Sequence, residues 1–172
     1  AAGLHVDQIR KVPTTLAASE ALYRSGLVDA VVTAEPWAGR LEKLGARRVF
    51  DSTAIPGRIV DVLGVRAEVI ESHALALRQL VAGHFSALKY MQGNALDASR
   101  RMAPRLQTPA NEVMLGFQGL KLPDAAENLA MLGAGGLLEK TLTDLQKVMV
   151  DAALLDRAQR FDDLIDTRFL RT

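Results

Sequence analysis

The segment from Val28 to Trp37 constrains the fold more than any other part of the chain. Its first part, 28–33, is short, apolar at nearly every position and rich in β-branched residues, which is typical of a strand covered on both faces of a parallel sheet. Pro36 fits the first position of a helix and favours an extended backbone at Glu35. The segment therefore predicts a buried strand that leads directly into a helix. Ligands of parallel sheets collect outside the carboxyl ends of the strands, so this junction is a candidate binding site.

Helix and strand patterns alternate around this junction. Strands are predicted at 9–12, 28–33 and 47–50, and helices at 16–25 and 36–44. Alternation at this spacing implies parallel strands joined by helices. A turn-rich connection over 51–58 follows, and the apolar run 59–65 then has strand character again. We therefore predict an α/β fold whose first part is a parallel β-α-β section.

Beyond residue 66 the pattern is helical almost throughout. Apolar residues over 73–92 recur at the three-and-four spacing of a helix face that packs on a core. Asp124 and Glu127 have the spacing of a capping box at the start of a later helix. The second part of the chain is therefore predicted to be a mostly helical region.

Composition excludes several classes of protein. Hydrophobic residues make up 49% and charged residues 24%, as in ordinary globular proteins. The net charge of +1 comes from interspersed charges, so the chain has no basic field for a nucleic acid. The absence of cysteine excludes disulfides, thiolate metal sites and a cysteine nucleophile. The longest apolar stretch, 74–91, is interrupted by charged side chains and is too short to span a membrane.

Hydroxyl groups follow three of the predicted strands, with Ser52 and Thr53 after strand 47–50. Thr14 and Thr15 come after strand 9–12, and Thr33 ends strand 28–33. The ends of parallel strands lie at the same edge of a sheet, so these hydroxyls are candidates for bonding the oxygens of a ligand. An equally good alternative is that Thr15 only caps the helix that follows it.

Glu35, Pro36 and Trp37 form the other half of the candidate site. The start of a helix attracts an anion such as a carboxylate, sulfonate or phosphate. A carboxylate at Glu35 repels an anion and favours an amine or a hydroxyl-bearing solute instead. Trp37 would stack on a planar or cationic group, an interaction worth about 0.5–2 kcal/mol. The structural alternative is that Glu35 caps its helix and Trp37 fills a gap.

No pattern indicates catalysis or metal binding. The three histidines lack metal-ligand spacing, and His84 belongs to the apolar stripe of its helix. The serine-nucleophile pattern Gly-x-Ser-x-Gly is absent from the sequence. The glycine-rich run 133–136 lacks the Lys-Ser/Thr of a phosphate loop. We therefore expect no cofactor, no metal and no enzymatic activity.

Several segments resemble one family in their order along the chain. The series 16–30, LAASEALYRSGLVDA, followed by VVTAEPW over 31–37, is similar to solute-binding proteins of ABC importers for nitrate, sulfonates, taurine and thiamine precursors. This is the NMT1-like or SsuA/THI5-like group. Segments 62–73, 122–128 and 163–170 also fit the later parts of that group.

The resemblance implies a two-lobed type II periplasmic-binding-protein fold with its pocket between the lobes. The chain would be a C-terminal half, because the strands that begin the first lobe have no counterpart in it. Residues 1–57 would belong to the second ligand-binding lobe, and 58–172 would form the helical return to the first lobe. The resemblance assigns ligand contacts to Thr14, Thr15, Thr33, Glu35, Pro36 and Trp37.

The function implied by the resemblance is solute binding for an ABC-type importer. The protein would be periplasmic or an exported lipoprotein, and it would deliver a small polar solute to a membrane permease. A sulfonate, a nitrate-like anion and an amine-bearing heterocycle remain open as solutes. The exposed sheet edge of a fragment would also favour a homodimer.

Two alternatives use the same fold. One is an enzyme resembling the pyrimidine synthases of thiamine biosynthesis, which need a cofactor-linked lysine and histidines at the cleft. The other is a ligand-sensing domain of a regulator.

Overall fold

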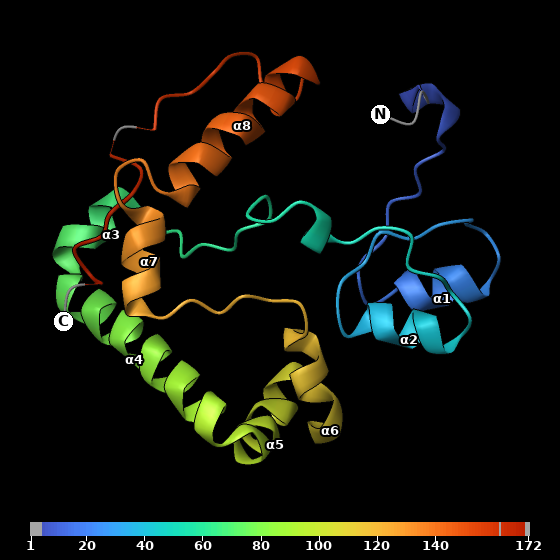
Figure 1. The fold of residues 1–172 in the computed structure, drawn as a ribbon, viewed down its shortest axis with the longest axis horizontal. Coiled ribbons are helices and arrows are strands. Elements are labelled where there is room, and N and C mark those ends of the chain that lie inside the picture. Colours follow the sequence, from blue (N-terminus) through green and yellow to red (C-terminus); the bar gives the residue numbers. More distant parts are fainter. Residues whose placement is uncertain (1–4, 162, 171–172) are drawn as a thin grey trace. The chain divides into compact units, whose positions relative to one another are not determined.

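The computed structural model describes residues 5–161 and 163–170, where all regular structure is helical (Figure 1). The elements in chain order are η1 (Val6–Gln8), α1 (Ser19–Arg24), α2 (Trp37–Lys43), η2 (Ser52–Ala54), α3 (Ala67–Ser72), α4 (Ala74–Gly93), α5 (Ala95–Leu106), α6 (Ala110–Val113), η3 (Met114–Phe117), α7 (Ala125–Leu132) and α8 (Leu137–Asp151). Here α denotes an α-helix and η a short 3₁₀-helix.

The predicted parallel β-α-β section is wrong, because the described residues contain no strand. A strand exists only where its backbone pairs with another strand. None of the amides from Val28 to Thr33 donates a hydrogen bond within the described part of the chain. Val32 and Val49 are 96% and 80% exposed, so the two predicted strands that contain them, 28–33 and 47–50, are not buried as expected. The α/β fold class is therefore replaced, over the described residues, by a helical one.

The helices themselves follow local signals in the sequence. Gly26 and Gly45 come directly after the last turns of α1 and α2, with φ of 68° and 93°. Glycine reaches this left-handed region without a steric penalty, which explains why both helices end there. The predicted helix over 73–92 corresponds to α4, the longest helix among the described residues.

The described residues form two compact units. The first unit consists of the residues up to Val49 together with Ser99–Gln118, and the second consists of Phe50–Ala98 together with the residues from Gly119 onward. The predicted division at 57/58 concerns the lobes of a complete two-lobed protein and remains a prediction.

The first unit is built around α1 and α2, which pack against each other. Leu41 of α2 is 5% exposed and Val113 of α6 is 3% exposed. Arg40 on α2 donates from Nη2 to Oε2 of Glu112 at 2.8 Å, which ties α2 to α6. A small apolar core and one half-buried ion pair therefore hold this unit together.

In the second unit, the loop around Gly57 is anchored on α8. Thr141 is 7% exposed and donates from Oγ1 to the carbonyl of Gly57 at 2.7 Å. Arg58 pairs with Asp144 one turn further along α8. Gly57 has a φ of 73°, and an added Cβ would lie 2.9 Å from Cδ1 of Leu137. Glycine is therefore favoured there by the backbone conformation, whereas the Leu137 side chain could move aside for a Cβ.

The capping box predicted from Asp124 and Glu127 is confirmed at the start of α7. The Glu127 amide donates to Oδ1 of Asp124 at 2.8 Å, and the Asp124 amide donates to Oε2 of Glu127 at 3.1 Å. The hydrogen bond from the Lys121 ammonium group, and then the one from the Asp124 amide, lower the pKa of Glu127 below its ordinary value of 4.5.

This lowered pKa predicts that acid destabilises the first turn of α7. Glu127 holds fewer protons in the folded chain than in the unfolded chain, so its contribution is complete above pH 4.5 and is lost as the pH falls below that value. Amide hydrogen exchange in α7, after correction for intrinsic rates, should accelerate as the pH falls below 4.5. The Glu127→Gln variant should lose this acceleration. An unchanged profile in the variant would show that Glu127 is not its cause.

None of the described helices is both long and apolar enough to cross a membrane.

Candidate functional site

The predicted junction lies at the start of α2, which begins at Trp37 with Pro36 in the N-cap position. Glu35 supplies the side-chain cap, because its Oε2 accepts a hydrogen bond from the Gly39 amide at 3.0 Å. This contact satisfies one of the free N–H groups of the first turn. Trp37 is half-buried. We refer to Glu35, Pro36 and Trp37 as the α2 corner.

Arg48 holds the other oxygen of Glu35. Its Nη2 lies 2.8 Å from Oε1 of Glu35, and its Nε lies 2.8 Å from Oε1 of Glu42. The hydrogen bonds to Glu42 and then to Glu35 raise the pKa of Arg48 above its ordinary value. The Glu35 side chain is only 14% exposed, whereas that of Arg48 is 41% exposed. The Glu35 carboxylate is therefore hydrogen-bonded, and Arg48 partly neutralises its negative charge.

The net charge of the cluster formed by Glu35, Glu42 and Arg48 affects which ligand the corner would favour. Two carboxylates, Glu35 and Glu42, share the guanidinium of Arg48. These three groups together carry one excess negative charge at neutral pH. The cluster thus favours a ligand that offers hydrogen-bond donors or a positive charge, although Arg48 weakens the repulsion of an anion that Glu35 alone would exert.

The threonines divide into two cases. Thr33 has its Oγ1 3.3 Å from Oγ of Ser19, which is fully buried at 0% exposure and also donates to the carbonyl of Leu16 at 2.6 Å. Thr15 accepts from the Ala18 amide through Oγ1 at 3.2 Å, so its hydroxyl caps the turn that leads into α1. Thr33 and Thr15 are thereby brought to the same region at the start of α1.

Within the described part of the chain, the Thr14 side chain forms no hydrogen bond with Thr33 or Ser19. Its Oγ1 reaches only the carbonyl of the neighbouring Thr15, at 3.4 Å, and both residues are exposed. Sequence reasoning also missed Ser19 and Arg48. Ser19 carries no signal because a serine inside a helical pattern is usually exposed. Arg48 lies 13 positions from Glu35, and no local spacing rule connects them.

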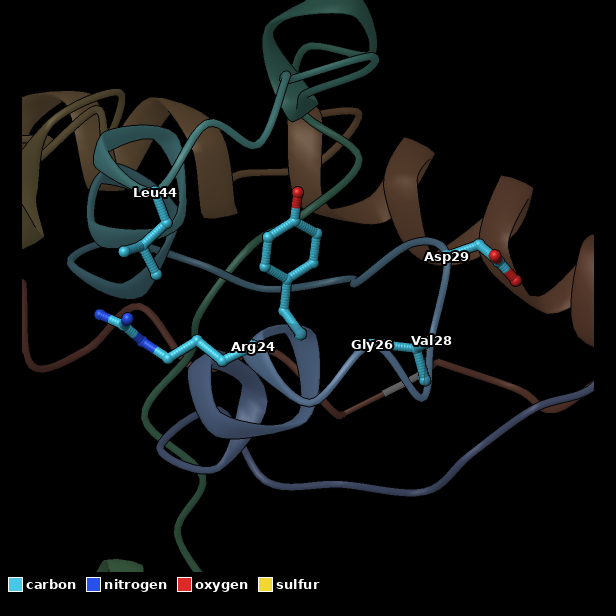
Figure 2. Close-up of a pocket in the computed structure, with 6 residues that line it drawn as sticks. Arg24, Gly26, Val28, Asp29 and Leu44 are labelled. Atoms are coloured by element: carbon cyan, nitrogen blue, oxygen red, sulfur yellow. The ribbon is translucent and has the colours of Figure 1, made fainter.

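A separate hollow of about 540 Å³ lies in the first unit, where α1 and α2 end. It is lined by Tyr23, Arg24, Gly26, Val28, Asp29 and Leu44. Figure 2 shows the Arg24 side chain extending toward Leu44, with Asp29 on the opposite side beyond Gly26 and Val28. The hollow contains none of the six predicted contact residues, so the α2 corner and the hollow are two distinct features of the unit.

The arrangement at the corner is suited to binding. With the neighbouring Arg48, it offers a hydrogen-bonded carboxylate, a guanidinium and an indole. Among the described residues, no group of three or more histidine, cysteine, aspartate or glutamate side chains is placed to hold a metal ion.

The sequence matches the model of the NMT1-like family over residues 1–107, which is more than half of the 172-residue chain. The chain therefore belongs to the NMT1-like family, and the resemblance stated from the sequence is confirmed. The matched region contains the whole α2 corner, Arg48 and the hollow. No match was found among curated proteins or among solved structures.

Proposed function

We propose that this chain is the solute-binding component of an ABC-type importer and that it binds a small polar molecule without making or breaking a bond. The observation that carries the proposal is the family match over residues 1–107, which includes the α2 corner. A binding role agrees with the chemistry of the corner, where the Glu35 carboxylate is already hydrogen-bonded and Trp37 begins α2.

The corner favours a particular kind of solute. Glu35 and Glu42 outweigh the single guanidinium of Arg48, which favours a solute with an amine or another donor. Trp37 adds a face for a planar or cationic group. An amine-bearing heterocycle satisfies both preferences, whereas a sulfonate or a nitrate-like anion would depend on Arg48 and on the hydroxyls of Thr33 and Thr15.

The proposed setting follows from the importer role. The protein would act in the periplasm or as an exported lipoprotein, and it would pass its solute to a membrane permease. Two-lobed receptors close on their ligand by a hinge, so the populations of the open and closed states would change on binding.

The proposal is tested by screening the full chain by thermal shift against 4-aminopyrimidine, methanesulfonate and nitrate, followed by calorimetry. We expect saturable binding of one of these, with 4-aminopyrimidine as the preferred solute. If 4-aminopyrimidine binds, Glu35→Gln should weaken it about fivefold because the charged acceptor is lost. Asp7→Asn is the control, since it removes a carboxylate from an exposed position of the same unit that does not pair with Arg48. Absence of binding by all three solutes would overturn this assignment.

The proposed homodimer now rests on exposed apolar residues, because the sheet edge from which it was expected does not exist among the described residues. Val32 and Val49 of the first unit are 96% and 80% exposed. Burying such side chains against a second copy is favourable at about 25 cal/mol per Å². We therefore expect multi-angle light scattering to give twice the chain mass of 18.6 kDa at high concentration. A monomer across the whole concentration range would refute the dimer.

A further inference from the structure

We propose that Glu42 is a specificity-determining residue that acts on the α2 corner through Arg48. By offsetting the charge of the guanidinium, Glu42 makes the corner select a cationic solute over an anionic one. This role rests on the proposed function, since it concerns the same solute site. Glu42 itself lies in the last turn of α2, outside the corner.

Arg48 links Glu42 to the corner. Its Nε donates to Oε1 of Glu42 and its Nη2 donates to Oε1 of Glu35, both at 2.8 Å. One rigid, planar guanidinium therefore connects the two carboxylates. The pKa of Arg48 is raised first by the hydrogen bond to Glu42 and then by the one to Glu35. Of these two carboxylates, Glu42 thus stabilises the charged guanidinium more.

The Glu35 carboxylate is fixed in place but still has room for a solute donor. Its Oε2 accepts from the Gly39 amide at 3.0 Å, and its Oε1 accepts from Arg48. An added Cβ on Gly39 would lie 3.2 Å from Oε2, so the glycine permits this close approach. A carboxylate has about four lone-pair sites, and these two hydrogen bonds use two of them. A donor group of the solute can therefore bind Glu35 beside Arg48.

The charge of Glu42 decides which solute is accepted there. A cation bound to Glu35 lies next to the positive charge of Arg48, which repels it. Glu42 offsets this charge, so the net attraction for a cation is kept. Without the charge of Glu42, Glu35 and Arg48 would form a neutral pair that no longer repels an anion. Arg40, the other arginine that α2 contributes to this unit, pairs with Glu112 instead.

The test compares two solutes of similar shape and opposite charge, benzylamine and benzoate, by calorimetric titration of the full chain at neutral pH. The unaltered chain should bind benzylamine more tightly than benzoate. In Glu42→Gln the side-chain oxygen can still accept from Arg48, but the charge is lost. Glu42 and Arg48 are 43% and 41% exposed, so solvent screens the effect. We expect benzylamine to bind about threefold more weakly and benzoate about threefold more tightly, which shifts the ratio of the two affinities about tenfold.

Two further variants complete the comparison. Arg48→Gln should shift the ratio about tenfold in the opposite direction, because the two carboxylates then lack their counter-charge. Asp7→Asn is the control, since it removes a carboxylate from an exposed position of the same unit that does not pair with Arg48, and it should leave the ratio unchanged. If Glu42→Gln loses its helical circular-dichroism signal, Arg48→Gln decides the question.

The Gly39 amide separates a charge effect from a structural one, because it reports the position of Glu35 without any solute. Its signal in a ¹⁵N-labelled chain should stay in place in Glu42→Gln. A shifted ratio together with a displaced Gly39 signal would mean that Glu42 positions Glu35, and it would overturn the proposal.

An unchanged ratio in Glu42→Gln would also overturn the proposal, while solute binding by the unaltered chain would leave the proposed function standing. If neither benzylamine nor benzoate binds the unaltered chain, the role of Glu42 is refuted, and the separate screen of three solutes decides the proposed function.

Discussion

Trp37→Ala is expected to weaken solute binding more than tenfold while the fold stays intact. Stacking of the indole on a planar or cationic group is worth about 0.5–2 kcal/mol. Loss of the indole also removes apolar contact area. A tenfold weakening corresponds to about 1.4 kcal/mol, which these two contributions together reach. The measurement is calorimetric titration of the variant with the solute found for the unaltered chain.

Tyr23→Ala is the matched control for this experiment. It also removes an aromatic side chain from the first unit, but Tyr23 lines the hollow and not the corner. Its solute affinity should equal that of the unaltered chain. If Trp37→Ala binds the solute as tightly as the unaltered chain, the indole is a packing residue and the corner is not the binding site.

Leu41→Ala should produce the largest loss of stability in the first unit. Leu41 is 5% exposed on the inner face of α2, and truncation of a buried leucine leaves a cavity and costs about 2–5 kcal/mol. Because few side chains of this unit are so deeply buried, we expect the midpoint of urea unfolding, followed by circular dichroism, to fall clearly.

Leu27→Ala is the comparison for Leu41→Ala, since Leu27 is 64% exposed in the same unit. Its effect on the free energy of unfolding should stay within about 0.5 kcal/mol. Equal effects of the two substitutions would mean that α2 does not pack through Leu41 in solution.

Local signals in the sequence predicted some of the helix ends. Gly26, Gly45 and the Asp124–Glu127 capping box act over one turn, and each lies where the sequence indicated. The strands were not predictable in this way. A run such as 28–33 is β-branched and apolar, but it becomes a strand only if another strand pairs with it. The described residues supply no such partner, and Val32 is left exposed.

The candidate site shows the same limit. Glu35 was expected to cap the helix, and its carboxylate accepts from the Gly39 amide. Pro36 was expected at the first helical position, but it occupies the N-cap and the helix begins at Trp37. Glu35 precedes α2 and Arg48 follows it. The two residues meet only because the chain turns back after the end of α2. Contacts of this kind depend on tertiary structure, so composition and spacing carry no trace of them.

Fluorescence of the single tryptophan tests most directly the claim that the α2 corner binds the solute. Trp37 is the only tryptophan in the chain, so its emission reports on the corner alone. Titration with the solute identified by calorimetry should shift and saturate this emission with the calorimetric dissociation constant, because the solute replaces water at the indole. Saturable binding in the calorimeter with no change in the emission of Trp37 would place the solute elsewhere and contradict the account.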